Sequence, residues 1–192
     1  MTRIAIIIGS TRPGRNGEAV AHWAFELASK RSDAQFELVD LADFSLPLLD
    51  EGMPPAMGQY SQLHTKQWSA KISSFDGFVF VTPEYNRSTS GALKNAIDFL
   101  YQEWTNKAAG FIGYGSNGGT RAVESLRLIM GELQVADVRS QVALSLFTDF
   151  ENYSTFKPSP KHENTVKQML DQVLAWGTAL RAVRRGAAGA GA

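Results

Sequence analysis

The chain begins with an apolar run that constrains its fold more than any other feature of the sequence. Between Arg3 and Gly9 the residues read Ile-Ala-Ile-Ile-Ile and include no polar side chain. A strand with one face in solvent alternates apolar and polar residues, whereas a strand covered on both faces does not. This β-branched run is therefore typical of a central strand in a parallel sheet.

Four further apolar runs follow, and segments with helical periodicity lie between them. Strands are predicted at residues 3–9, 36–40, 77–82, 108–114 and 135–146. The first helix is predicted to follow the turn at 10–16 and to run to about residue 31. Further helices are predicted at 65–74, 90–101, 119–133 and 161–184. This alternation predicts an α/β fold with right-handed crossovers and helices on both faces. Five strands suit a flavodoxin-like three-layer sandwich with a parallel sheet in the order 2-1-3-4-5.

Length and charge limit the other possibilities. The 192 residues suit a single domain over residues 1–185, with a mobile Gly/Ala tail without function at 186–192. Lys plus Arg and Asp plus Glu both total 19, so no overall positive field favours nucleic acid or an anionic membrane. The chain contains no Cys, so electron transfer needs a borrowed cofactor. The lack of a signal peptide or membrane span favours a cytoplasmic location.

The segment from Leu41 to His64 contains three prolines and two glycines and cannot be a regular element. Loops of this length in a compact domain often cover functional sites. We therefore expect a long surface loop that edges the active site.

The loops after strands one, three and four should converge, because ligands of open parallel sheets bind where the strand order reverses. The first of them, Gly9-Ser-Thr-Arg-Pro-Gly-Arg-Asn-Gly17, combines hydroxyl and guanidinium groups with glycines before a helix N-terminus. Such a loop attracts an anion and predicts a phosphate site. The Gly-Lys-Ser/Thr ending of an ATP-binding loop is missing. The alternative is a polar turn capped by Asn16.

The second loop begins with Pro83-Glu-Tyr-Asn86, which places an aromatic ring and an amide directly after a buried strand. Its alternative is a β-turn with Pro at the second position. The third loop, Gly113-Tyr-Gly-Ser-Asn-Gly118, matches the G-x-G-x-x-G dinucleotide fingerprint, with Asp137 about twenty residues on. A Rossmann domain normally carries this fingerprint at its first turn. Here the glycines instead favour close approach of backbone amides to a flat ring.

These segments resemble the NADPH-dependent FMN reductase family, which includes bacterial chromate, quinone and azo reductases of flavodoxin-like fold. The resemblance covers residues 3 to about 150. It is found in the four segments Gly9-Ser-Thr-Arg12, Thr82-Pro-Glu-Tyr-Asn86, Ser90-Gly-Ala-Leu-Lys-Asn-Ala-Ile-Asp-Phe99 and Gly115-Ser-Asn-Gly-Gly119. Each is modest alone, but their order and their positions at the strand ends are specific.

The resemblance implies a set of residues that bind FMN. The phosphate would be held by Ser10, Arg12, Asn16 and Gly17, the isoalloxazine lined by Pro83, Glu84, Tyr85 and Asn86, and its pyrimidine end met by Ser116, Asn117, Gly118 and Gly119. Many relatives carry a second Ser or Thr in the phosphate loop. Here Arg15 and Asn16 stand in that region, and either of them could contact the phosphate.

The implied activity is oxidoreduction with NADPH or NADH as co-substrate. Hydride would pass to bound FMN and then to quinone, azo, metal-oxyanion or flavin acceptors in a ping-pong sequence. No side chain is predicted to be catalytic, because the chemistry takes place on flavin N5. Amides of residues 116–119 would stabilise negative charge on the flavin, and Arg15 or Arg87 would help to read NADPH. The three His are dispersed, so no metal site is predicted.

A homodimer or homotetramer is also expected. The third helix carries Ala92, Phe99 and Tyr101 outside its main apolar side, which is more apolar surface than one sheet face can bury. Two other functions stay open. One is a flavodoxin-like one-electron carrier without NAD(P)H oxidase activity, although such carriers are usually acidic. The other is an NAD-dependent Rossmann dehydrogenase that uses residues 113–118.

Overall fold

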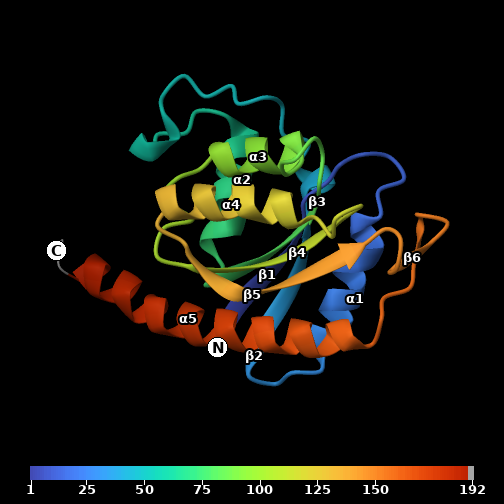
Figure 1. The fold of residues 1–192 in the computed structure, drawn as a ribbon. Coiled ribbons are helices and arrows are strands. Elements are labelled where there is room, and N and C mark those ends of the chain that lie inside the picture. The colour runs from blue at the N-terminus through green and yellow to red at the C-terminus, as the bar shows by residue number, and fades with distance from the viewer. Residues whose placement is uncertain (190–192) are drawn as a thin grey trace.

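The computed structural model of the protein describes residues 1–189 and shows the predicted three-layer α/β sandwich (Figure 1). The five-stranded sheet has the order β2-β1-β3-β4-β5, and all its neighbours are parallel. The strands are β1 (Thr2–Ile8), β2 (Ala34–Asp40), β3 (Gly77–Pro83), β4 (Ala108–Gly115) and β5 (Ala136–Ser145). The helices are α1 (Gly17–Ser29), α2 (Leu63–Ser73), α3 (Gly91–Asp98), α4 (Thr120–Glu132) and α5 (Lys161–Gly189).

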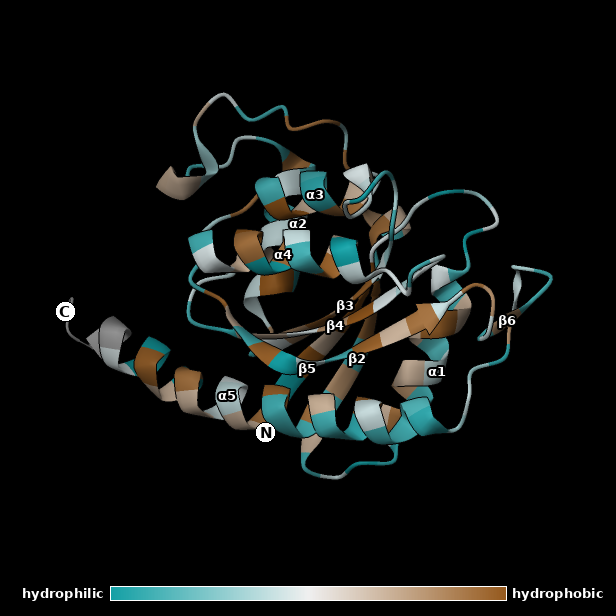
Figure 2. Ribbon diagram, in the orientation of Figure 1, coloured by the Kyte–Doolittle hydropathy of each residue, from teal (hydrophilic) through white to brown (hydrophobic). Residues whose placement is uncertain are grey.

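Two apolar clusters, one on each face of the sheet, account for the unbroken apolar run of β1. Ile4 and Ile6 pack with α1 and α5, whereas Ala5 and Ile7 pack with α2, α3 and α4. Successive side chains of a strand point to opposite faces, so a strand covered on both faces is apolar at every position. Figure 2 shows the hydrophobic strands inside and hydrophilic residues along the outer surfaces of the helices.

Helix α5 continues further than its apolar periodicity indicated. Residues 186–189, which were assigned to the tail, are the last part of this helix. Extending an existing helix costs far less than starting one, so the two alanines can continue α5 although the other two residues are glycines, which are poor helix formers. The rest of the expected tail, residues 190–192, lies outside the described residues.

The long segment after β2 is a surface loop, interrupted by two 3-10 turns, η1 (Leu41–Phe44) and η2 (Pro55–Met57). Asn95 of α3 fastens its first half: the side-chain amide donates to Pro47 O at 2.6 Å and accepts from Leu49 N at 3.0 Å. Glu51 fastens its second half by accepting from Ser61 N at 2.8 Å, just before α2. The loop is therefore held against the helices on its face of the sheet.

The expectation that Ala92, Phe99 and Tyr101 leave apolar surface for a partner subunit is wrong for Phe99, whereas Ala92 and Tyr101 are half-buried. Phe99 and Trp104 are fully buried within the chain. The cover comes from α2, where Trp68 donates its indole N–H to Ala96 O at 2.7 Å and lies 6.2 Å from Trp104, centroid to centroid. The helix that precedes β3 therefore supplies the contacts that a second subunit would have had to make.

A two-stranded antiparallel hairpin, β6 (Phe150–Glu151) and β7 (Thr155–Phe156), lies between β5 and α5 and was not among the predicted elements. Buried Asp149 holds this connection together. Its carboxylate accepts from Ser145 N at 2.9 Å and lies 3.0 Å from His162 Nε2 at the start of α5. Within residues 1–189, no helix has the length and apolar character needed to cross a membrane.

Candidate functional site

The loops after β1, β3 and β4 meet at the carboxyl edge of the sheet, as predicted from the strand order. The Gly9 amide donates to Val81 O at 2.8 Å, and the Glu84 amide donates to Tyr114 O at 3.1 Å. These bonds continue the pairing of the strands into the loops. A side-chain contact also joins the first two loops, since the Tyr85 hydroxyl lies 3.3 Å from Ser10 Oγ.

The first loop leaves the sheet through a space that admits only glycine. A Cβ at Gly9 would lie 2.7 Å from Val81 O and 2.8 Å from Leu93 Cδ2. Ser90 secures the same position: it donates its hydroxyl to Gly9 O and accepts from Leu93 N at 3.0 Å. One serine thus caps α3 and fixes the point at which the first loop begins.

Helix α1 begins with its first-turn amides uncapped. The residue at the capping position, Asn16, donates its side-chain amide to Tyr153 O at 2.8 Å, and within the described residues it makes no capping bond. The alternative of a polar turn capped by Asn16 is therefore wrong. Free first-turn amides at the positive end of a helix dipole form an anion site. The exposed side chain of Arg12, whose Nε donates to the Tyr85 hydroxyl at 3.3 Å, adds positive charge there.

Arg15, by contrast, turns into the protein. One of its terminal nitrogens donates to Ser10 O at 2.6 Å, and the other pairs with Asp40 at the end of β2. Its side chain is only 12% exposed. Arg15 therefore braces the first loop, and Arg12 is the guanidinium of this loop that a ligand can reach.

The second loop ends in a tight turn over residues 85–88. Tyr85 N donates to Ser88 O at 2.9 Å and Ser88 N donates to Tyr85 O at 3.1 Å. The two central residues, Asn86 and Arg87, have φ angles of 49° and 69°, the left-handed values of a type I′ turn. Such a conformation costs a residue with a long side chain about 1–2 kcal/mol. A turn with Pro83 at its second position is wrong, because Pro83 is the last residue of β3.

Glu84, predicted to line a flavin, binds the protein instead. Its carboxylate accepts from Arg121 N at 3.1 Å and pairs with the Arg121 guanidinium at 2.6 Å. The Glu84 side chain is 7% exposed. This carboxylate therefore caps α4, whose preceding residue is a glycine, and ties the second loop to the third.

The third loop folds back tightly on β4, which explains its glycines. A Cβ at Gly113 would lie 2.8 Å from Gly119 O, and a Cβ at Gly119 would lie 2.5 Å from Tyr114 N. Gly118 and Gly119 have φ angles of 66° and 67°, which only glycine adopts readily. Ser116 is exposed at the tip of the turn.

The match to a dinucleotide fingerprint in this loop is a packing feature. Asp137, the acidic residue that the fingerprint needs, is the second residue of β5 and pairs with Arg127 of α4. It therefore lies at the amino end of its strand, away from the edge where the loops meet. The Rossmann alternative is wrong for this reason and because of the strand order.

Sequence reasoning missed one residue below the first loop. Tyr114 is 5% exposed, and its hydroxyl has no hydrogen-bond partner among the residues that the structure describes. A Cβ at Gly17 would lie 2.6 Å from this hydroxyl oxygen. A buried hydroxyl without a partner is costly, which fits a site that binds a ligand with acceptor atoms. The one sequence signal for Tyr114 was its position between two glycines of the fingerprint, Gly113 and Gly115.

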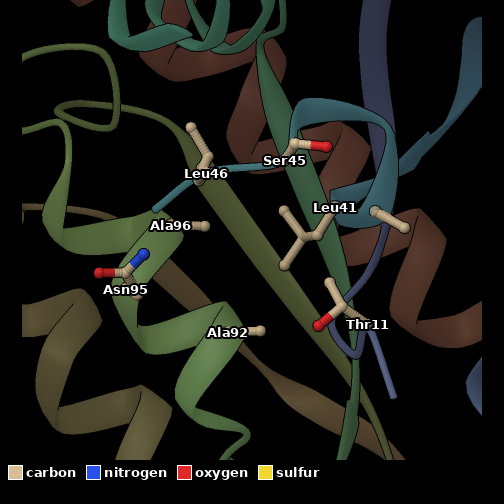
Figure 3. A pocket seen from close by; sticks show the side chains of 8 residues that line it. Thr11, Leu41, Ser45, Leu46, Ala92, Asn95 and Ala96 are labelled. Carbon is tan, nitrogen blue, oxygen red and sulfur yellow. The ribbon is translucent and has the colours of Figure 1, made fainter. Parts of the chain in front are cut away.

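A cavity of about 310 Å³ lies beside the first loop, between α3 and the loop after β2. Figure 3 shows Thr11, Leu41 and Ala92 around the same space, and Ser45 and Leu46 of the long loop also line it. Thr11 belongs to the predicted phosphate loop. The long loop therefore borders the place where a ligand of that loop would lie.

The predicted site residues fall into three groups. Those exposed at the meeting edge are Arg12, Tyr85, Asn86, Ser116 and Asn117. Those buried at its base are Ser10, Gly17, Pro83, Gly118 and Gly119. The side chains bound to protein partners are those of Arg15, Asn16 and Glu84. The arrangement offers an anion site at one end and a glycine-lined turn at the other, which fits a phosphorylated flat ligand.

Comparisons with known proteins agree with this geometry. An NAD(P)H-dependent FMN reductase, ntnL of Nectria sp, is 42% identical over 159 residues, which are 78% of this chain and 79% of the relative. An FMN-dependent NADPH-azoreductase of Staphylococcus aureus is 30% identical over 178 residues, 89% of this chain and 93% of the relative.

Among solved structures, the flavoenzyme FerB of Paracoccus denitrificans, an NAD(P)H:(acceptor) oxidoreductase, has the same fold. It aligns with a TM-score of 0.73 and 20% identity, over 93% of this chain and 98% of that one. The family of NADPH-dependent FMN reductases matches residues 2–149. This chain therefore belongs to the NADPH-dependent FMN reductase family, enzymes that use FMN together with NAD(P)H.

Proposed function

We propose that the protein holds FMN as a bound prosthetic group at the carboxyl edge of its sheet. The observation that carries this proposal is the uncapped start of α1 beside the exposed guanidinium of Arg12. The phosphate would bind there, with Ser10 at the base of the loop. Neither Arg15 nor Asn16 contacts the phosphate through its side chain in this proposal, because both have protein partners.

The flat end of FMN would lie between the second and third loops. Tyr85 and Asn86 would line it together with Pro83 and the backbone of Glu84. The amides of residues 116–119 precede α4 and lie at the positive end of its dipole, where they favour a ligand that gains negative charge. Glu84 contributes by holding Arg121, and so the start of α4, in place.

FMN, when bound, supplies the redox chemistry by accepting a hydride from NAD(P)H and passing the electron pair to an acceptor. The chain's own part is to bind, orient and shield the FMN, and no side chain is assigned as an acid or base. We propose that the nicotinamide and the acceptor use the same exposed place in turn, which gives ping-pong kinetics. Quinones, azo compounds, metal oxyanions and flavins are the proposed acceptors; the azo class is supported by the name of the Staphylococcus aureus relative.

Arg87 is the proposed contact for the extra phosphate of NADPH. It stands exposed at the tip of the 85–88 turn, whereas Arg15, the other predicted candidate, is paired with Asp40. Changing Arg87 to Ala should lower kcat/KM for NADPH more than for NADH. Equal losses for the two nucleotides would contradict this assignment.

The visible spectrum of the purified protein tests the proposed function. The protein should show flavin bands, and the cofactor released by heat should be FMN. Mixing with NADPH in a stopped-flow instrument should bleach those bands rapidly, and steady-state double-reciprocal plots should be parallel. A colourless protein that takes up no added FMN would refute the proposal, and a flavoprotein that NADPH does not bleach would favour a one-electron carrier.

A homodimer or homotetramer remains our proposal, on a surface that includes Tyr101 from the expected one but extends to the loop after β2. The loop after β2 and the start of α2 leave Leu48, Met57 and Leu63 at 85%, 51% and 70% exposure. A groove of about 310 Å³ lined by Pro55, Leu133 and their neighbours lies between this loop, α3 and α4. Exposed apolar surface of this kind is typical of an interface. Sedimentation of a monomer alone at micromolar concentration would contradict it.

We further propose that residues 1–185 form one cooperative domain and that the protein acts in the cytoplasm. A single thermal transition with coincident spectroscopic and calorimetric curves would support the first point. Cell fractionation would test the second.

A further inference from the structure

The Tyr114 hydroxyl is a buried polar group at the site that none of the contacts above uses. Its side chain extends from β4 into the apolar cluster under α1. The hydroxyl is the only polar atom of the side chain, and it is buried without a partner within the described part of the chain. Buried hydroxyls are nearly always hydrogen-bonded, so this exception requires an explanation.

The hydroxyl lies against the first turn of α1. Gly17 opens that helix, and its missing side chain is what makes room for the oxygen, which a Cβ would approach to 2.6 Å. Burial raises the pKa of the Tyr114 hydroxyl well above its ordinary value and Tyr85 raises it further, which outweighs the lowering by Arg12, the Gly17 amide and Arg15. At neutral pH the group is therefore protonated and can donate.

We infer that the Tyr114 hydroxyl donates a hydrogen bond to the phosphate of FMN and helps the protein to distinguish FMN from riboflavin, which lacks that phosphate. This inference rests on the proposed function. Tyr114 is a binding residue here and takes no part in hydride transfer.

The chemistry of the neighbours favours a phosphate over a neutral partner. The other polar groups assigned to this end of the site can all donate: the first-turn amides of α1, the guanidinium of Arg12 and the hydroxyl of Ser10. A phosphate offers only acceptor oxygens and can satisfy several donors at once, and hydrogen bonds to a charged acceptor are the strong ones. A buried donor also interacts more strongly than one in water.

Binding of FMN and of riboflavin to the FMN-free protein, measured by quenching of flavin fluorescence, tests the inference. Tyr114→Phe should weaken FMN binding ~10-fold or more, the scale of one hydrogen bond to a charged group, and should leave riboflavin binding unchanged. Tyr101→Phe is the matched control. It removes a hydroxyl that donates to Glu132 O at 3.2 Å, between α3 and β4 at the opposite edge of the sheet.

The two flavins separate this role from a structural one. If Tyr114 only supports the fold, Tyr114→Phe will weaken the binding of both flavins equally or of neither, and either result overturns the inference. Such results leave the proposed function intact, because the unmodified protein still binds FMN. If the unmodified protein binds no FMN, the proposed function and the inference both fail.

A second pair of variants tests the geometry without any flavin. Gly17→Ala should destabilise the protein, because the new Cβ would meet the Tyr114 hydroxyl oxygen. In the Tyr114→Phe background the same change should cost less, since the nearest ring carbon lies 3.3 Å from the Cβ position. Equal shifts of the thermal midpoint in both backgrounds would show that the hydroxyl does not lie under Gly17, and would overturn the inference.

Discussion

Replacing Glu84 should lower the free energy of unfolding of the protein, because this side chain holds the fold and does not take part in the chemistry. The Glu84 side chain is only 7% exposed, and its carboxylate accepts two hydrogen bonds from Arg121. Glu84→Ala removes a helix cap, worth about 1 kcal/mol, and a hydrogen-bonded charge, worth about 1.5–3 kcal/mol. The Arg121 side chain is 28% exposed, so water partly replaces the lost carboxylate. The lower half of the range for the charged hydrogen bond therefore applies. We expect a loss of ~3 kcal/mol.

Thermal unfolding of the FMN-free protein measures this loss. For a chain of this size, ~3 kcal/mol corresponds to a fall in midpoint of roughly 6–12 °C. Glu84→Gln is the matched variant: it keeps an acceptor for Arg121 N but removes the charge, and should cost about half as much. If the midpoint of the FMN-free protein is unchanged while FMN affinity falls, Glu84 is a ligand contact and the capping role is refuted.

Three further predictions concern groups outside the candidate site. Asp149→Ala should cost ~3 kcal/mol or more in urea unfolding, because it leaves Ser145 N and its other buried donors unpaired; a loss under 1 kcal/mol would contradict this. Burial opposes ionisation of Glu51, but hydrogen bonds from Ser61, Thr65 and Gln62 together outweigh it and lower its pKa to about 2. The carboxylate thus stabilises the fold at neutral pH, and the advantage of wild type over Glu51→Gln should disappear as pH falls from 4.5 to 2. Burial lowers the pKa of Lys107 to about 7, so wild-type stability relative to Lys107→Met should rise from pH 7 to 10.5; a flat difference would refute this.

The central strands were predictable because burial on both faces leaves a direct trace in the sequence. In β1 every position from Ile4 to Ile8 is apolar, and each is buried. The same logic failed for α3, since the sequence shows that Phe99 needs cover but not which element supplies it. Part of that cover comes from His64 of α2, whose ring centroid lies 5.6 Å from that of Phe99, and a contact between residues so far apart in the chain has no local signal.

The candidate site was predictable in its loops but not in its side chains. Glycines and strand ends locate the loops because backbone geometry demands them, as the short distances at Gly9 and Gly119 show. Whether Arg12 or Arg15 faces a ligand depends on the position of Asp40 at the end of another strand. Tyr114 was missed because an aromatic residue in a buried strand is normally a core residue.

The bond between Asn16 and the carbonyl of Tyr153 has a consequence for how this enzyme can diverge. A main-chain oxygen is the same in every amino acid, so the side chain at position 153 is free to change while the contact persists. What must persist is the left-handed bend at Asn152 and Tyr153, with φ angles of 51° and 60°, which aims the carbonyl. Since the family match ends at residue 149, a segment beyond it supports the first loop of the candidate site through its backbone shape, and comparison of residue identities would overlook it.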